Sequence, residues 1–130
     1  MFSSFLVHRH KTGKTHFDLR ILINNTLRSW SLLREPPTQT GERRLAILRE
    51  DLTLEELSRP LVDEEAFGAG RVQMWDEGEV EIKELSPRRI RLVFRGRKLS
   101  GNYEMALMRW YPGNRWIMRK TAAAGAHDLA

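Results

Sequence analysis

The chain has 130 residues, 41% of them hydrophobic, which is enough for one domain with a buried core and too little for two domains of ordinary size. It contains no cysteine, which excludes disulfides, thiolate metal ligands and cysteine nucleophiles. It has no apolar run of about 18 residues and no secretion-signal pattern, so we expect a cytoplasmic protein that contacts no membrane.

The net charge of +5 is unevenly distributed along the chain. Residues 1–50 hold nine basic and four acidic side chains, residues 51–84 three and eleven, and residues 85–120 ten and one. Basic flanks around an acidic middle favour binding of a polyanion such as nucleic acid. An ordinary solvated surface of mixed charge is the alternative. Without a clear apolar surface stripe, we expect a monomer.

The amino-terminal part predicts a strand followed by a β-hairpin. Residues 2–9 form the expected first strand, and residues 15–23 and 26–33 form the hairpin. Its turn falls at Asn24 and Asn25, because asparagine tolerates the positive φ that tight hairpin turns require.

The remaining chain predicts further short strands with little helix. After the turn-rich loop EPPTQTGE, residues 44–49 predict a strand, and residues 51–58 predict a helical turn or two with Asp51 as N-cap. Further strands are expected at residues 71–75, 79–85, 89–94, 102–110 and 115–120, separated by turns at DEG, SPR, RGRKLSG and YPGN. This pattern favours one domain over residues 1–121, a barrel or a sandwich, followed by a flexible tail over 122–130.

The segment HRHKTGKTHFDLR combines groups that bind metals. From Thr15 the residues alternate, which places His16, Asp18 and Arg20 on one face of a strand and Phe17, Leu19 and Ile21 on the other. With His10, two imidazoles and a carboxylate can share one divalent ion and leave coordination positions open, as in catalytic sites. Imidazole ligands favour manganese, zinc or a similar metal over magnesium and calcium. Solvated histidines without a metal are the alternative.

Several other side chains admit two interpretations. Arg20 can bind a phosphate near the metal or form an ion pair with Asp18. Five further arginines either bind the phosphates of a DNA backbone or keep the strand edges soluble: Arg34, Arg43, Arg44, Arg95 and Arg97. A choice between stacking on an unpaired base and packing in the core applies to Trp30, Trp75, Trp110 and Trp116.

Five ordered blocks of the chain resemble the 3′-phosphoesterase domain of bacterial DNA ligase D, which also occurs as small free-standing proteins. HRHKTGKTHFDLRI is similar to the family signature of His, five residues, His, aromatic, Asp, aromatic and Arg. LRSWSLLREPP and RRLAILRED are similar to its Leu-Lys-Ser-Trp and Lys-Arg-Leu-Ala segments. FGAGRVQMWDEGEVE is similar to its Gly-Ala-Gly and Trp-Asp block, and GRKLSGNYEMALMR with RWIMRK to its last strands.

The resemblance implies a closed or nearly closed antiparallel β-barrel that binds a manganese-type ion. It implies removal of a 3′ ribonucleoside and a 3′ phosphate from a primer strand of DNA or DNA-RNA during DNA break repair by non-homologous end joining. Carried over by position, the metal ligands are His10, His16 and Asp18. The phosphate-binding residues are Arg20, Arg34 and Arg44, and Arg20 and Arg44 are also catalytic.

The chain departs from the family at two positions. After Glu50 and Asp51 the family continues with a His and, four residues later, a Tyr, where this chain has Leu52 and Glu56. His8 stands where the family usually has Gln, and it is our candidate for an imidazole that acts from another direction. We therefore expect a metal-dependent 3′-end-processing phosphoesterase with weakened activity. The alternative is a catalytically impaired module that binds nucleic-acid ends beside a DNA ligase or polymerase.

Overall fold

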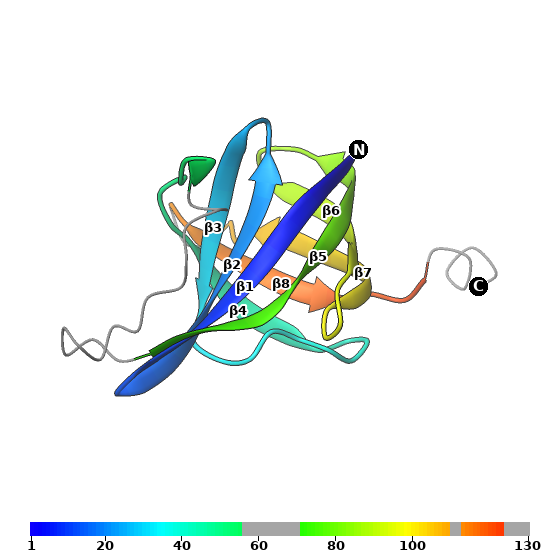
Figure 1. Ribbon diagram of the computed structural model, residues 1–130. Helices are drawn as coiled ribbons and strands as arrows, with labels where there is room; N and C mark the ends of the chain where they lie inside the picture. Colours follow the sequence, from blue (N-terminus) through cyan, green and yellow to red (C-terminus); the bar gives the residue numbers. More distant parts are fainter. Residues whose placement is uncertain (56–70, 110–112, 124–130) are drawn as a thin grey trace.

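Eight antiparallel strands close into a barrel in the computed structural model, which describes residues 1–55, 71–109 and 113–123 (Figure 1). The strands are β1 Phe2–Thr12, β2 Lys14–Ile23, β3 Thr26–Leu32, β4 Arg43–Leu48, β5 Arg71–Leu85, β6 Arg89–Arg95, β7 Ser100–Leu107 and β8 Arg115–Lys120. Their order around the barrel is β1-β2-β3-β4-β8-β7-β6-β5. The expected mainly-β fold is confirmed, and it is a barrel and not a sandwich. No helix within the described residues is long and apolar enough to cross a bilayer.

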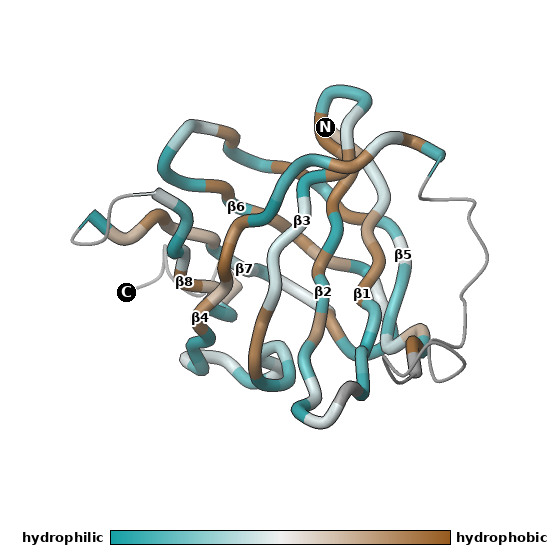
Figure 2. The backbone as a smooth tube through the Cα atoms, turned by 90° about the vertical axis from the view of Figure 1, so that its left-hand side faces the viewer, coloured by the Kyte–Doolittle hydropathy of each residue, from teal (hydrophilic) through white to brown (hydrophobic). Residues whose placement is uncertain are grey.

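The core fills the barrel interior with alternate residues from the strands. Hydrophobic and polar residues accordingly alternate along much of β2 in Figure 2. The largest buried side chains are aromatic, and they pack edge to face, with ring centroids 4.7 Å apart for Phe5 and Phe94 and 5.8 Å apart for Trp30 and Trp116. Two of the four tryptophans are therefore core residues. Trp75 is half-buried and packs against Phe17, while Trp110 lies outside the described residues.

The hairpin turn predicted between β2 and β3 is confirmed. Asn24 and Asn25 have φ values of 50° and 64°, the positive pair that a tight hairpin requires. Between β1 and β2 the chain turns at Gly13, whose φ is 66°. β1 also runs three residues further than expected, so that its end reaches this turn and pairs with the start of β2.

Residues 76–78 do not form the turn that their DEG sequence predicted. β5 is one strand of 15 residues, and its Asp76, Glu77 and Gly78 pair with β1. Glycine suits this position because a Cβ on Gly78 would lie 2.5 Å from the carbonyl oxygen of Arg95 on β6. The predicted turn was wrong because these residues continue β5 and pair with β1, so the chain does not reverse there.

Asp76 binds the loop that joins β6 to β7. Its buried carboxylate accepts backbone N–H groups from Arg97 at 3.0 Å, Lys98 at 3.0 Å and Leu99 at 2.7 Å. A Cβ on Gly96 would lie 2.4 Å from the Asp76 Oδ2 atom, so glycine lets this loop approach the carboxylate. The WDEG and RGRKLSG segments, far apart in sequence, thus form one structural unit.

The helical turn expected at 51–58 does not begin at Asp51, although Glu55 within it is helical. Leu52, which directly follows the expected N-cap, forms an isolated β-bridge with Leu27, and their backbone hydrogen bonds measure 2.9 and 2.8 Å. The end of this turn lies outside the described residues, as do position 110 of the strand expected at 102–110 and the expected tail from residue 124.

Candidate metal centre

The three expected metal ligands lie on the outer face of the β1–β2 hairpin. The register pairs His10 with His16 and His8 with Asp18, so all four side chains lie on the same face of the hairpin. The alternate residues of β2 fill the barrel interior, where Phe17, Leu19 and Ile21 are 6%, 0% and 0% exposed. The two-faced strand that the alternation predicted is therefore confirmed.

His10, His16 and Asp18 converge on one point. The Asp18 Oδ2 atom lies 2.9 Å from His10 Nε2 and 3.6 Å from His16 Nε2. The two imidazoles stack, with centroids 4.6 Å apart and planes 9° from parallel. One potential ligand atom from each residue lies within 4.8 Å of the others. Donors that share an ion through bonds of about 2.0–2.2 Å lie roughly 3–4 Å apart, so this donor set fits a divalent metal.

Hydrogen bonds and nearby positive charges keep Asp18 ionised, although it is buried. Burial alone raises the pKa of this carboxyl, but hydrogen bonds from His10 and Ser31 and the charges of the two histidines outweigh it, and the net pKa is lowered. The carboxylate is the form that ligates a metal.

His8 lies beside the ligands and is 7% exposed. Burial, followed by the positive charges of Arg20 and His10, lowers the pKa of His8 to about 4, although Asp18 opposes the shift. His8 is therefore neutral at pH 7, with one imidazole nitrogen able to accept a hydrogen bond.

Arg20 also adjoins the cluster, as its position two residues beyond Asp18 predicted. It pairs with Ser29 on β3 and with Leu6 on β1. The positive charge of Arg20 contributes to the lowered pKa of His8, so Arg20 acts electrostatically on the cluster. Its buried Nε atom has no hydrogen-bond partner among the residues the structure describes. The alternative interpretation of Arg20, an ion pair with Asp18, is not found among the ion pairs of Asp18 with described residues.

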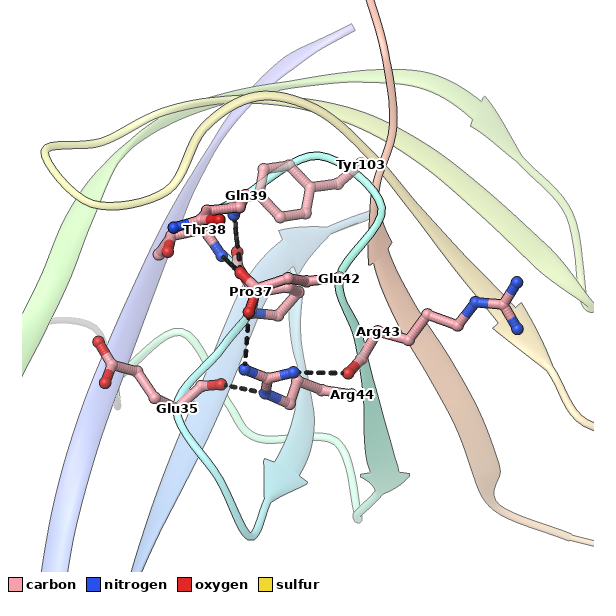
Figure 3. A network of polar contacts seen from close by, with 8 residues as sticks. All are labelled: Glu35, Pro37, Thr38, Gln39, Glu42, Arg43, Arg44 and Tyr103. Atoms are coloured by element: carbon pink, nitrogen blue, oxygen red, sulfur yellow. Dashed lines mark hydrogen bonds and ion pairs between the residues drawn. The ribbon is translucent and has the colours of Figure 1, made fainter.

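Arg44 binds the loop before β4 (Figure 3). Its guanidinium donates to the Glu35 and Arg43 carbonyl oxygens, both at 2.7 Å, and to the Glu42 carboxylate at 3.2 Å. It pairs with Met118, a core residue, so it lies on the inward-facing side of β4. None of these hydrogen bonds of Arg44 involves a residue of the metal cluster.

Arg34 is exposed and follows the end of β3. Leu32 at that end pairs with Phe17, the neighbour of His16. Arg34 thus lies beyond the ligand end of the hairpin, with its side chain open to solvent.

Leu52, at one departure from the family, is half-buried beside β3. Its bridge partner Leu27 lies on the same face of β3 as Ser29 and Ser31. An aliphatic side chain therefore lies where the family has a His. Glu56 lies outside the described residues.

Two residues of the cluster escaped the sequence analysis. Ser31 Oγ donates a 2.9 Å hydrogen bond to Asp18 Oδ1, and Arg49 Nε donates to Ser31 Oγ at 3.2 Å. The only sequence signal was the spacing of Ser29 and Ser31 on either side of Trp30, which places both serines on the face of β3 opposite to Trp30.

Known proteins match nearly the whole chain. The family model of the DNA ligase D 3′-phosphoesterase domain matches residues 8–107. The multifunctional non-homologous end joining DNA repair protein LigD of Mycobacterium tuberculosis is 28% identical over 123 residues, which cover 91% of this chain and 16% of that protein. The LigD protein of Mycolicibacterium smegmatis is 26% identical over 128 residues, covering 89% and 16%. That of Pseudomonas aeruginosa is 27% identical over 107 residues, covering 78% and 13%. The chain therefore spans only about one sixth of these relatives.

Proposed function

Since the chain belongs to the family of DNA ligase D 3′-phosphoesterase domains, we propose that it is a metal-dependent phosphoesterase acting on the 3′ ends of DNA strands. It would remove a 3′ phosphate or a 3′ ribonucleoside during repair of DNA breaks. The observation that carries this proposal is the convergence of two imidazoles and one carboxylate on one point of the barrel surface. Such a set leaves room in the coordination sphere for a phosphate oxygen and water.

The proposed ligands are His10, His16 and Asp18, and the metal is manganese, or else zinc or another transition metal. A divalent ion bound there supplies Lewis acidity to a phosphate oxygen and to water. Arg20 neutralises negative charge on the phosphate, because it lies on the ligand face two residues beyond Asp18. His8, neutral at pH 7, accepts a proton beside the phosphate.

The charged residues around the cluster suggest how a DNA end is held. Exposed Arg34 lies beyond the ligand end of the hairpin, where it can contact the backbone of the bound strand. Arg44 contacts phosphate in this proposal only if its guanidinium leaves Glu42 and the carbonyl oxygens that it now binds.

A second candidate function rests on Leu52. A leucine donates neither a hydrogen bond nor a proton, and removal of one transition-state donor commonly lowers a rate about 10²- to 10³-fold. The chain could then be a module that binds DNA ends through the same surface and acts beside a DNA ligase or polymerase.

The experiment that separates these functions measures release of phosphate or nucleoside from primers that carry a 3′ phosphate or a 3′ ribonucleotide. Wild-type protein with Mn²⁺ is compared with the His16→Ala variant, and primer binding is measured for both. Metal-dependent release by the wild type that the variant lacks supports the enzyme. If the wild type releases no more product than the variant while it still binds the primer, the enzymatic function is contradicted. The end-binding function then remains.

A further inference from the structure

We propose that Ser31 and Arg49 form a positioning pair that orients the Asp18 carboxylate toward the metal ligands. The inference rests on the metal site of the proposed function and assigns a role to two residues outside the ligand set. It starts from the 2.9 Å bond between Ser31 Oγ and Asp18 Oδ1 and the 3.2 Å bond between Arg49 Nε and Ser31 Oγ.

The direction of these hydrogen bonds follows from the groups involved. A guanidinium only donates, so the Ser31 oxygen must accept from Arg49. The single hydroxyl proton of Ser31 then points away from Arg49, and the Oδ1 atom of Asp18 accepts it. Arg49 thus fixes the rotation of the Ser31 hydroxyl.

The bond from Ser31 fixes which carboxylate oxygen faces the histidines. Because Oδ1 is bound to Ser31, Oδ2 is the oxygen that lies 2.9 Å from His10 Nε2 and 3.6 Å from His16 Nε2. Asp18 and Ser31 are both 8% exposed, so water competes little for their hydrogen bond. The carboxylate is therefore held with one oxygen directed at the ligand point.

The strand register builds this arrangement into the barrel. Asp18 on β2 pairs with Ser31 on β3, and Ser31 pairs with Ile47 on β4. Arg49 lies two residues beyond Ile47 and hence on the same face, and its backbone N–H donates to the Ser29 carbonyl at 2.8 Å. Arg49, the first residue after β4, thus lies opposite Ser29 and diagonally across from Ser31, and its side chain reaches the Ser31 hydroxyl.

Titration of Mn²⁺, followed by the electron paramagnetic resonance signal of the free ion, tests the pair without relying on catalysis. Loss of a residue that orients a ligand typically weakens metal binding about 10- to 100-fold, and we expect this loss for Ser31→Ala. Arg49→Ala should weaken binding less, because the serine hydroxyl remains. Ser31→Thr should restore affinity, since it keeps the hydroxyl on a β-branched side chain that suits a strand.

Ser29→Ala is the matched control, because Ser29 is a buried serine on the same face of the same strand. The double variant of Ser31 and Arg49 should bind Mn²⁺ no more weakly than Ser31→Ala alone, because Arg49 acts through Ser31. If Ser31→Ala lowers the yield of folded protein, the Mn²⁺ affinity of Arg49→Ala is compared with that of the wild type instead.

Two results overturn the positioning role: affinity of Ser31→Ala equal to that of Ser29→Ala, or losses from Ser31→Ala and Arg49→Ala that simply add. The proposed activity fails separately, when the wild type binds Mn²⁺ but releases no product. A wild type that binds no Mn²⁺ overturns the metal site and the positioning pair together.

Discussion

Among single residues, His8 has the environment of a neutral proton acceptor next to the metal ligands. Replacement by Gln removes the acceptor nitrogen that titrates while keeping a polar side chain of similar reach. General acid–base catalysis contributes about 10²- to 10⁴-fold, so product release by His8→Gln at pH 7 should fall about 100-fold. Mn²⁺ affinity should remain unchanged, because His8 is not one of the three clustered ligands.

Single-turnover release and Mn²⁺ titration of the same samples separate these effects. A His8→Gln protein with the wild-type rate removes His8 from the mechanism. A parallel loss of Mn²⁺ affinity assigns His8 to the metal site and not to proton transfer.

At the level of structural elements, Asp76 joins β5 to the loop between β6 and β7. Besides the three N–H groups of that loop, its carboxylate accepts the N–H of Glu77 at 3.0 Å. Hydrogen bonds to charged groups contribute about 1.5–3 kcal/mol each, and their loss leaves buried donors unpaired. Asp76→Ala should therefore lower the free energy of unfolding by about 3 kcal/mol or more.

Urea denaturation of Asp76→Ala and of Glu77→Ala measures this contribution. Glu77 is the exposed neighbour, and its replacement should change the free energy of unfolding by less than about 0.5 kcal/mol. Similar transition midpoints for the two variants would disprove the anchoring role of Asp76.

Tyr103 joins β7 to the loop before β4 through a buried hydrogen bond (Figure 3). Its hydroxyl donates to the Pro37 carbonyl oxygen at 2.7 Å. Burial, followed by the negative charges of Glu42 and Asp76, raises the pKa of Tyr103. Tyr103→Phe should lower the free energy of unfolding at pH 7 by about 1 kcal/mol.

The raised pKa also gives this bond a pH dependence of known sign. Because the folded pKa lies above the unfolded value of about 10, the Tyr103 contribution is complete below pH 10 and is lost as pH rises toward the folded pKa. Urea denaturation between pH 8 and 11 should show a steeper loss of stability for the wild type than for Tyr103→Phe. Identical pH profiles would rule out this linkage.

Sequence patterns predicted the elements whose rules are local. The alternation around Asp18 and the asparagine pair at the hairpin turn both depend on neighbouring residues, and both are confirmed. The DEG segment and the contact of Ser31 with Asp18 depend on partners from other strands. Neither Asp76 nor Ser31 carries a local signal of its partner, because barrel closure and register decide both contacts.

At the scale of the whole molecule, acidic and basic segments that are separate in the sequence lie on neighbouring strands of the barrel. The acidic residues of β5 face the basic residues of β6, with Arg95 lying 3.2 Å from Glu79 and Arg89 lying 3.3 Å from Glu84. On β7 and β8, Glu104 lies 3.6 Å from Arg119. The segregation seen along the chain is therefore largely cancelled on this side of the barrel, and antiparallel pairing is the reason.

This arrangement limits the basic residues that a DNA strand at the metal cluster can meet. Each phosphate contact adds about 0.9 to the slope of log affinity against log salt. Arg34→Ala should therefore reduce the slope by about 1, measured by fluorescence anisotropy of a 3′-phosphorylated primer. Arg91→Ala should leave the slope unchanged, because Arg91 lies on β6, four strands around the barrel from β3. The opposite pattern would place the DNA on the other side of the barrel.

The location of all three candidate ligands on one hairpin affects the order of folding. His10, His16 and Asp18 lie within nine consecutive residues, whereas closure of the barrel pairs His10 with Val72, far along the chain. Hairpins form within about 1–10 μs, while pairing between distant strands is slower. The ligand set can therefore assemble before the barrel closes. A bound metal should then raise the refolding rate and not only retard unfolding, because its site belongs to the earliest structure formed.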